Sequence, residues 1–145
     1  MKVAAARPAD LPAIRTLLAA SGLPGEDLTP AHLRSFWVLE DAAGLAGVVG
    51  LEPCSQAALL RSLAIRADAR GRGAGTALLA HAETGAATLG IDALYLLTTT
   101  AAKFFAARGY AVTARDAVPP GIGATAEFAA LCPSGSVCMT KRLAR

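Results

Sequence analysis

The sequence predicts an α/β fold in which the sheet is antiparallel in its first half and contains a parallel pair of strands in the middle. Before residue 66, short apolar segments alternate with tight turns, which is typical of antiparallel hairpins. After it, a glycine-rich turn leads into a long helix-like segment and then into another apolar segment, which predicts a crossover between parallel strands. The 145 residues show no repeat or linker, so we expect a single domain over residues 1–145.

The first part of the chain is expected to contain one short strand, Lys2–Arg7, and two helices. The first helix opens at Pro8, carries apolar residues at helical spacing and ends at the glycines and proline of residues 22–25. Thr29 as N-cap and Pro30 at the first helical position start a short second helix that runs through Arg34. The hairpin strands then follow: Phe36–Glu40, Leu45–Leu51 and Ala57–Ile65.

The second half is organised around one long helix, Ala77–Leu89, which Gly90 ends. Its apolar stripe consists of Leu78, Ala82, Ala86 and Leu89. Strand and helix patterns then alternate to the end of the chain: Ala93–Thr98, Ala101–Arg108, Tyr110–Arg115, Thr125–Leu131 and Val137–Arg142. The crossover through the long helix should make Ala93–Thr98 parallel to Ala57–Ile65.

The most informative segment is the strand and turn Leu59–Thr76, where the sequence Arg-Gly-Arg-Gly-Ala-Gly-Thr precedes the long helix. A glycine-rich turn at a helix N-terminus gathers backbone N–H groups into a nest that binds phosphate or pyrophosphate. Arg70 and Arg72 add positive charge and forked donors that suit phosphate oxygens. An ordinary strand-to-helix turn is the alternative, but the glycines and arginines together favour a phosphate site.

Two familiar phosphate-binding motifs do not fit this turn. A nucleotide-triphosphate P-loop requires a lysine after its last glycine, and no lysine follows Gly75. A dinucleotide fingerprint requires Gly-x-Gly-x-x-Gly, and neither Gly71 nor Gly73 begins that pattern.

The arrangement Arg70-x-x-Gly73-x-Gly75, between a strand and a helix, resembles the acetyl-CoA-binding motif of the GNAT N-acetyltransferases. The order of elements is similar to the GNAT fold over nearly the whole chain, and the block from Leu94 to Tyr110 resembles the late strand and helix of that family. The resemblance implies a mixed central sheet flanked by helices. Its N-terminal meander would be antiparallel, and its parallel central pair would splay to form an acetyl-CoA cleft.

Two later blocks narrow the resemblance. The pattern LTT…FF…RGY, together with Glu127–Pro133 and the ending Cys138–Lys141, resembles the arsenic-resistance (ArsN-type) branch and is similar to the acetyltransferase domain of N-acetylglutamate synthases. The resemblance implies transfer of the acetyl group of acetyl-CoA to the α-amine of a small glutamate-like amino acid, of the arsinothricin or phosphinothricin type, by direct attack in a ternary complex. The alternatives are a different amine (glutamate, a polyamine, an aminoglycoside or a protein N-terminus) or a non-catalytic regulator that binds acetyl-CoA.

The same resemblance implies which residues hold the cosubstrate. The backbone of Leu63, Ala64 and Ile65 would pair with the pantetheine arm like an added strand, and an N–H near Ala64 would contact the oxyanion. Phe105 would line the cleft at a position where many members carry a tyrosine that protonates the departing thiolate, so this chain lacks that hydroxyl. The residues that would surround the pyrophosphate are Arg70, Gly71, Arg72, Gly73, Ala74, Gly75 and Thr76.

For the base that deprotonates the acceptor amine, the sequence favours Glu52. This residue ends a meander strand where several family members place a carboxylate facing the cleft, although a strand-end surface glutamate has the same pattern. Glu127 is a weaker candidate, which we expect to cap or solvate a helix.

A glutamate-like acceptor also needs cations for its acidic groups. We expect Arg61 to be the carboxylate clamp, because alternation puts it on the same strand face as Leu63 and Ile65. Ser62 would point to the other face and bond a neighbour, and Arg34 on the short helix is the second choice, although single arginines are more often surface residues.

Composition excludes other classes of partner. The formal net charge of +3 is spread along the chain, which argues against nucleic-acid binding, and the apolar segments are too short to span a membrane. Cys54, Cys132 and Cys138 form no Cys-x-x-Cys pair, so we predict no metal site. The N-terminus lacks the apolar core of a signal peptide, so a cytoplasmic chain is expected. A homodimer is an expectation drawn only from the family, whose members often pair through their C-terminal strands.

Overall fold

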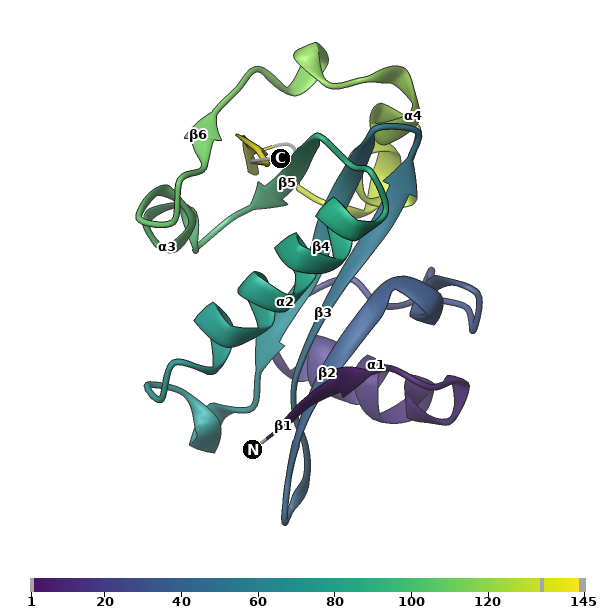
Figure 1. Cartoon of the computed structure of the whole chain (residues 1–145), viewed down its shortest axis with the longest axis vertical. Coiled ribbons are helices and arrows are strands. Elements are labelled where there is room, and N and C mark those ends of the chain that lie inside the picture. The colour runs from purple at the N-terminus through teal and green to yellow at the C-terminus, as the bar shows by residue number, and fades with distance from the viewer. Residues whose placement is uncertain (1, 134, 144–145) are drawn as a thin grey trace.

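The computed structural model describes residues 2–133 and 135–143, and it forms one seven-stranded mixed sheet with helices on both faces (Figure 1). The spatial order of the strands is β1-β2-β3-β4-β5-β7-β6. Their bounds are β1 Lys2–Ala5, β2 Phe36–Asp41, β3 Gly44–Cys54, β4 Ala57–Ile65, β5 Ala93–Thr98, β6 Ala111–Val112 and β7 Val137–Arg142. The predicted α/β class and the antiparallel meander of β2, β3 and β4 are confirmed.

The parallel pair forms as predicted, between β4 and β5. Its pairing is short, because it runs only from Ala57 with Ala93 to Leu59 with Tyr95, whereas β4 continues to Ile65 and β5 to Thr98. The two strands therefore diverge beyond Leu59 and open the sheet on one side.

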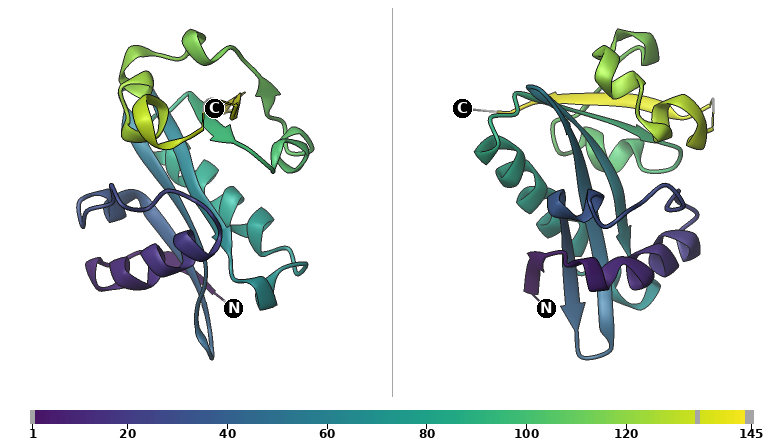
Figure 2. Two further views of the ribbon diagram at one scale, coloured as in Figure 1. Left: turned by 180° about the vertical axis from the view of Figure 1, so that it is seen from behind. Right: turned by 90° about the vertical axis from the view of Figure 1, so that its right-hand side faces the viewer.

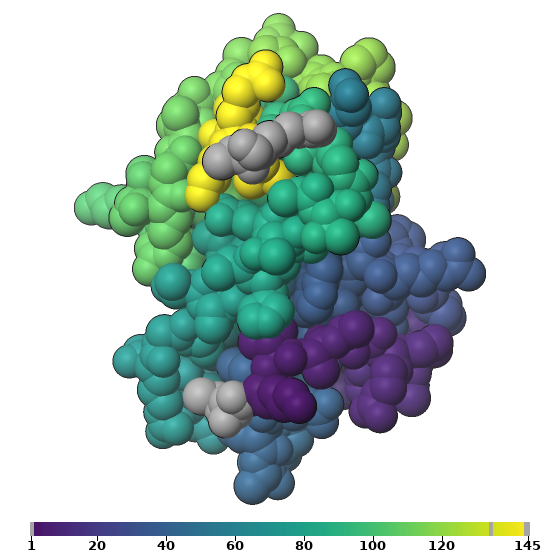
Figure 3. Space-filling model, in the orientation of Figure 1, coloured from purple at the N-terminus to yellow at the C-terminus, as the bar shows by residue number. Residues whose placement is uncertain are grey.

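The longer helices cover opposite faces of the sheet (Figure 2). The α-helices are α1 Leu11–Ala20, α2 Ala74–Thr88, α3 Ala102–Ala106 and α4 Pro120–Gly123. Short helical turns occupy η1 Pro8–Asp10, η2 His32–Ser35, η3 Ala67–Ala69, η4 Arg115–Ala117 and η5 Glu127–Leu131. Figure 3 shows α2 (teal) crossing one face diagonally, between the N-terminal elements and the C-terminal ones. Within the described residues, no helix is both long and apolar enough to cross a bilayer.

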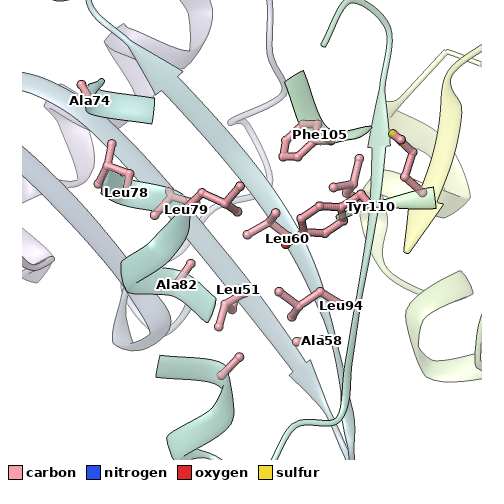
Figure 4. Packing of buried hydrophobic residues seen from close by; sticks show 14 of the residues in the cluster. Leu51, Ala58, Leu60, Ala74, Leu78, Leu79, Ala82, Leu94, Phe105 and Tyr110 are labelled. Carbon is pink, nitrogen blue, oxygen red and sulfur yellow. The ribbon is translucent and has the colours of Figure 1, made fainter. Parts of the chain in front are cut away.

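Three apolar clusters hold these layers together. The largest joins α2 to β3, β4 and β5, and Leu79 points from the helix toward Leu60 of the sheet (Figure 4). A second packs α1 against the opposite face. The third lies under α4 and η5, around Leu59 and Phe128.

Several predicted elements differ in extent. The helix expected from Thr29 is the short turn η2, in which backbone N–H groups donate to carbonyls three residues earlier (His32 to Thr29 and Leu33 to Pro30) instead of four. The long helix begins at Ala74, three residues earlier than expected, and ends before Leu89, whose side chain is 57% exposed instead of joining the apolar stripe. The strand expected at Tyr110–Arg115 is reduced to the two residues of β6.

The last two helices are also shorter than predicted. The α3 helix covers five residues instead of Ala101–Arg108, and η5 begins at Glu127 instead of Thr125. The α4 helix, which starts at Pro120, was not predicted, although proline commonly occupies the first position of a helix.

Candidate active site

A cavity of about 530 Å³ lies where β4 and β5 diverge. It is lined by residues 60–65 of β4, residues 96–101 at the end of β5, and the loop that follows α1. Arg70 and Gly75 lie at one end of it, and Glu127, Cys132 and Ser136 of the C-terminal segment also face it. The predicted cleft is therefore present, and it connects the glycine-rich turn to a group of buried polar side chains.

The strand that lines this cavity contains a β-bulge at Ser62. Val48 pairs with Ala64 whereas Gly50 pairs with Arg61, so β4 carries one extra residue, and Ser62 has a φ of 62°. The bulge reverses the alternation of side chains. Leu63 and Ile65 consequently pack against the α2 cluster, whereas Arg61 faces the other side of the sheet.

The predicted placement of Arg61 is therefore wrong. It does not share a face with Leu63 and Ile65, and Ser62 does not point away from it, because the Ser62 hydroxyl accepts a hydrogen bond from Arg61 Nε (2.9 Å). A one-residue bulge inverts every following side chain of a strand, and nothing in the local sequence announces it.

Arg61 is buried at the centre of a charged cluster. Its Nη1 and Nη2 atoms donate to both oxygens of Asp27 (2.6 and 2.8 Å), and Nη1 also donates to Glu52 Oε2 (2.7 Å). Glu127 Oε1 lies 3.3 Å from Arg61 Nε. All three guanidinium nitrogens donate to side chains of the protein itself, so Arg61 does not present the free fork expected of a substrate clamp.

The charges in this cluster shift one another's pKa values. Hydrogen bonds from Arg61 lower the pKa of Asp27, although partial burial opposes that shift. Burial by itself would lower the pKa of Arg61, but the hydrogen bond to Asp27 and the charge of Glu127 raise it overall. Arg61 is therefore a permanent buried cation.

Glu52, the predicted base, belongs to the outer part of this cluster. Besides Arg61, its carboxylate faces His32, whose Nε2 lies 3.7 Å from Glu52 Oε1. Glu52 is not among the described residues that line the cavity. Asp27, His32 and Glu52 have ligand types that suit a metal ion, but Arg61 Nη1 donates to both carboxylates and already supplies a positive charge.

Glu127 is the carboxylate of the cluster that reaches the cavity. The residue is 4% exposed, so the expectation that it caps or solvates a helix is wrong. Burial raises the pKa of Glu127 to about 7; Arg61 opposes the shift, and Asp27 and Glu52 add to it. Burial of this residue follows from the packing of its neighbour Phe128 in the third cluster.

Two other polar groups lie in this wall, Cys132 and Ser136, and the sequence assigned neither of them to the site. Burial, and then the charge of Glu127, raises the pKa of the Cys132 thiol to about 11, which keeps it protonated near neutral pH. The Ser136 hydroxyl is buried and finds no hydrogen-bond partner among the described residues. No local pattern marks either residue as part of a cavity wall.

At the other end of the cavity, the glycine-rich turn has the geometry of an anion-binding nest. Gly71 and Gly73 have φ values of 79° and 77°, and Gly73 is the residue that precedes α2. A positive φ strongly favours glycine, and the space above both residues is open. The N–H groups of the first turn of α2 have no acceptor within the helix, and residues 73–76 line a cavity, as binding of a diphosphate requires.

A second, smaller cavity lies over this nest. Its walls are formed by Arg70, by the glycines and first helical residues, and by Phe104 and Arg108 of the α3 region. Arg72 is exposed and lines neither cavity. The residues present fit the pyrophosphate of acetyl-CoA, because backbone donors and a cation converge on one open space.

Arg108 was missed as a candidate for this site. Its guanidinium stacks 3.7 Å from the centre of the Phe104 ring and donates to Thr76 Oγ1 (2.8 Å). It lies 32 residues from Thr76 in the sequence, and its only local signal is its place before Gly109 at the end of a short helix.

The remaining predicted residues divide between the cavity and the surface. Phe105 is buried, stacks edge-on against Tyr110 and lines the cavity, as expected for a packing residue without a hydroxyl. Arg34 is exposed on η2 and is not among the described residues that line the cavity.

Comparison with known proteins agrees with this geometry. The chain is 32% identical to the amino-acid acetyltransferases of two Neisseria meningitidis strains, serogroups A and B, over 90 residues, which are 61% of this chain and 21% of theirs. The chain thus spans about a fifth of the length of these relatives.

Solved structures show the same fold. N-acetylglutamate synthase from Neisseria gonorrhoeae, in complex with coenzyme A and N-acetyl-glutamate, superposes with a TM-score of 0.85 at 26% identity over 99% of this chain and 35% of that one. Rv2747 from Mycobacterium tuberculosis, in complex with CoA, superposes with a TM-score of 0.81 at 23% identity over 99% and 100% of the two chains.

The family model for the acetyltransferase (GNAT) domain matches residues 32–112. This range contains the bulged strand, the nest and the start of the divergence between β4 and β5. Since it covers more than half of the chain and agrees with the fold, this chain belongs to the GNAT acetyltransferase family.

Proposed function

We propose that this protein transfers the acetyl group of acetyl-CoA to the α-amine of a small glutamate-like amino acid, in a ternary complex. The observation that carries the proposal is the continuity of one cavity, from the nest at Arg70 and Gly75 to the buried carboxylate of Glu127. A cosubstrate bound at one end and an amine bound at the other would meet where β4 and β5 diverge.

In this proposal the nest binds the pyrophosphate and the bulged strand binds the pantetheine arm. Beyond Leu59, β4 has no pairing with β5, so an edge with free backbone groups faces the cavity at Leu63 and Ala64. Arg70 lies at the rim, where its Nε donates to the Ile65 carbonyl (3.1 Å). Arg108 extends the positive rim on the α3 side.

The chemistry requires a free amine, a polarised thioester and a departing thiolate. A backbone N–H near Ala64 supplies the oxyanion contact. Phe105 donates no proton, but a CoA thiol with a pKa near that of cysteine, about 8.5, leaves without a strong acid. The Ser136 hydroxyl in the cavity wall can donate a hydrogen bond to the departing sulfur or to the acceptor.

The glutamate-like acceptor is supported by the relatives. The Neisseria meningitidis proteins are amino-acid acetyltransferases, and the Neisseria gonorrhoeae structure contains N-acetyl-glutamate. We infer arsinothricin or phosphinothricin as the acceptor, because the blocks around Thr98 and Cys132 resemble the arsenic-resistance branch. The cluster of Asp27, Glu52 and Glu127 around one arginine carries excess negative charge and attracts an ammonium group.

The test is a thiol-release assay with phosphinothricin, arsinothricin and glutamate side by side, and with spermidine and an aminoglycoside as the alternative amines. We expect turnover with the first two acceptors at a kcat/KM at least tenfold above that for any other amine. Faster turnover of another amine would show that the acceptor belongs to a different chemical class. Calorimetric binding of acetyl-CoA without thiol release on any amine would indicate a regulator instead of an enzyme.

A further inference from the structure

We propose that Glu127, and not Glu52, is the catalytic base that removes the proton from the acceptor ammonium. The proposal rests on the acetyl transfer proposed above and assigns one of its steps to a particular side chain.

Access to the cavity distinguishes the two carboxylates. Glu127 lines the same cavity as the unpaired stretch of β4 and the nest, whereas Glu52 is not among the described residues that line it. Glu52 lies between Arg61 and His32, which it contacts through its two carboxylate oxygens. An acceptor in the cavity therefore meets Glu127 without disturbing the cluster.

The hydrogen bonds of the cluster also leave Glu127 free to accept a proton. Arg61 uses its two Nη atoms on Asp27 and Glu52, and its Nε donates to Ser62. Within the described part of the chain, the Glu127 carboxylate accepts no hydrogen bond and has only the ionic contact of 3.3 Å with Arg61 Nε. A base with free lone pairs can bind the incoming N–H without first breaking a strong contact.

The charges around Glu127 suit proton transfer near neutral pH. Arg61 favours the ionised carboxylate, whereas Asp27 and Glu52 disfavour it, and Cys132 is a neutral thiol at that pH. Arg115 lies beyond them, over the ring of Phe128. Burial dominates the balance and brings the pKa of Glu127 to about 7, where a base is most effective.

The proposed step conserves atoms and charge. The Glu127 carboxylate takes one proton from the ammonium, and the neutral nitrogen then forms a C–N bond with the thioester carbonyl carbon. The C–S bond of the tetrahedral intermediate breaks, the second N–H proton passes to the thiolate, and Glu127 returns its proton to solvent. The products are the amide, CoA thiol and one released proton.

The experiment compares three variants with the same chemical change: Glu127→Gln, Glu52→Gln and the exposed Glu40→Gln as a control. The readouts are acetyl-CoA affinity by calorimetry and the pH dependence of kcat/KM with phosphinothricin. We expect Glu127→Gln to lose about 10²–10⁴-fold in kcat/KM at pH 7 with an acetyl-CoA Kd within twofold of wild type. The rise in kcat/KM through about pH 7 that the wild type shows should be absent in Glu127→Gln. The difference in kcat/KM between the two proteins should become smaller toward pH 9, where free amine becomes abundant.

Glu52→Gln should keep the rise through pH 7, and Glu40→Gln should match the wild type. Loss of the rise in Glu52→Gln, with its retention in Glu127→Gln, would overturn the proposal. Wild-type protein that acetylates no amine would instead contradict the proposed function.

A second measurement covers the case in which Glu127→Gln does not fold, and it needs no acceptor. Carbon-13 NMR of glutamate-labelled wild type bound to CoA should show one carboxyl that titrates near pH 7, and Glu127→Asp should remove that signal. Titration of every glutamate carboxyl below pH 5.5 would overturn the assignment.

Discussion

At the scale of single residues, Arg61 organises the site because its one positive charge is shared among Asp27, Glu52 and Glu127. Such a cluster is costly to bury, so each missing partner would leave an unbalanced charge in the interior. Hydrogen bonds from the guanidinium's Nη atoms lower the pKa of Asp27, whereas burial raises the pKa of Glu127 beside its Nε. The same cluster therefore contributes to stability with opposite pH dependence at its two ends.

This opposition predicts how stability changes with pH. The folded-state pKa of Asp27 is lowered, so its contribution is present above the unfolded-state value of 3.8 and is lost as pH falls through the folded value. The folded-state pKa of Glu127 is raised from 4.5 to about 7. Its contribution to stability is therefore present below pH 4.5 and is lost as pH rises through 7. In urea unfolding, the free energy of unfolding of the wild type should therefore be lower at pH 8 than at pH 5. This difference between the two pH values should be smaller in Glu127→Gln. An equal drop in both proteins would contradict the raised pKa of Glu127.

At the scale of elements, we expect the junction between β4 and α2 to determine whether the cosubstrate can bind. The Ser62 bulge turns Arg61 into the charged cluster and sends Leu63 toward α2, and the left-handed glycines then point the first turn of α2 at open space. Both features are backbone conformations, and the nest needs glycine at positions 71 and 73 because of their positive φ.

The nest is tested by Gly73→Val. A side chain at a φ of 77° is strained by about 1–2 kcal/mol and would occupy the space for the diphosphate. We expect a folded protein without measurable acetyl-CoA binding by calorimetry. Gly90→Val is the matched control, because Gly90 has a φ of 79° after the far end of α2. It should be strained equally yet bind acetyl-CoA normally, and near-normal affinity in Gly73→Val would exclude the nest as the diphosphate site.

The sequence was informative where local chemistry decides the structure. The motif from Arg70 to Gly75 located the nest, and the apolar segments on either side of α2 predicted the parallel pair. The sequence was misleading where contacts between residues far apart in the chain decide the structure. Asp27 meets Arg61 across 34 residues and Arg108 meets Thr76 across 32, and neither contact has a local pattern. Glu127 has the same local signal as a surface glutamate, and only the packing of Phe128 beside it buries its carboxylate.

At the scale of the whole molecule, close approach between α2 and the meander fixes the layer spacing. The Trp37 ring of β2 lies against Gly85 of α2, and a Cβ added there would overlap the ring. This contact ties the N-terminal strands to the helix whose first turn forms the nest.

The contact is tested by Gly85→Ala. Alanine favours the helix by about 1 kcal/mol, but overpacking against Trp37 should cost about 1–3 kcal/mol, so we expect net destabilisation in urea unfolding. Ala80→Gly at an exposed position of α2 measures the helix-propensity effect separately. A more stable Gly85→Ala protein would show that the two layers are not closely packed there.

The early end of pairing between β4 and β5 should also limit which acyl donors can be used. An unpaired strand edge presents amide and carbonyl groups at fixed intervals. A ligand bound beside it makes the most hydrogen bonds if it carries peptide-like groups at matching intervals. Pantetheine has two such amides, whereas acetyl phosphate has none and would leave the exposed rungs of the ladder to water. We therefore expect the main chain of β4 to contribute to selectivity for the carrier.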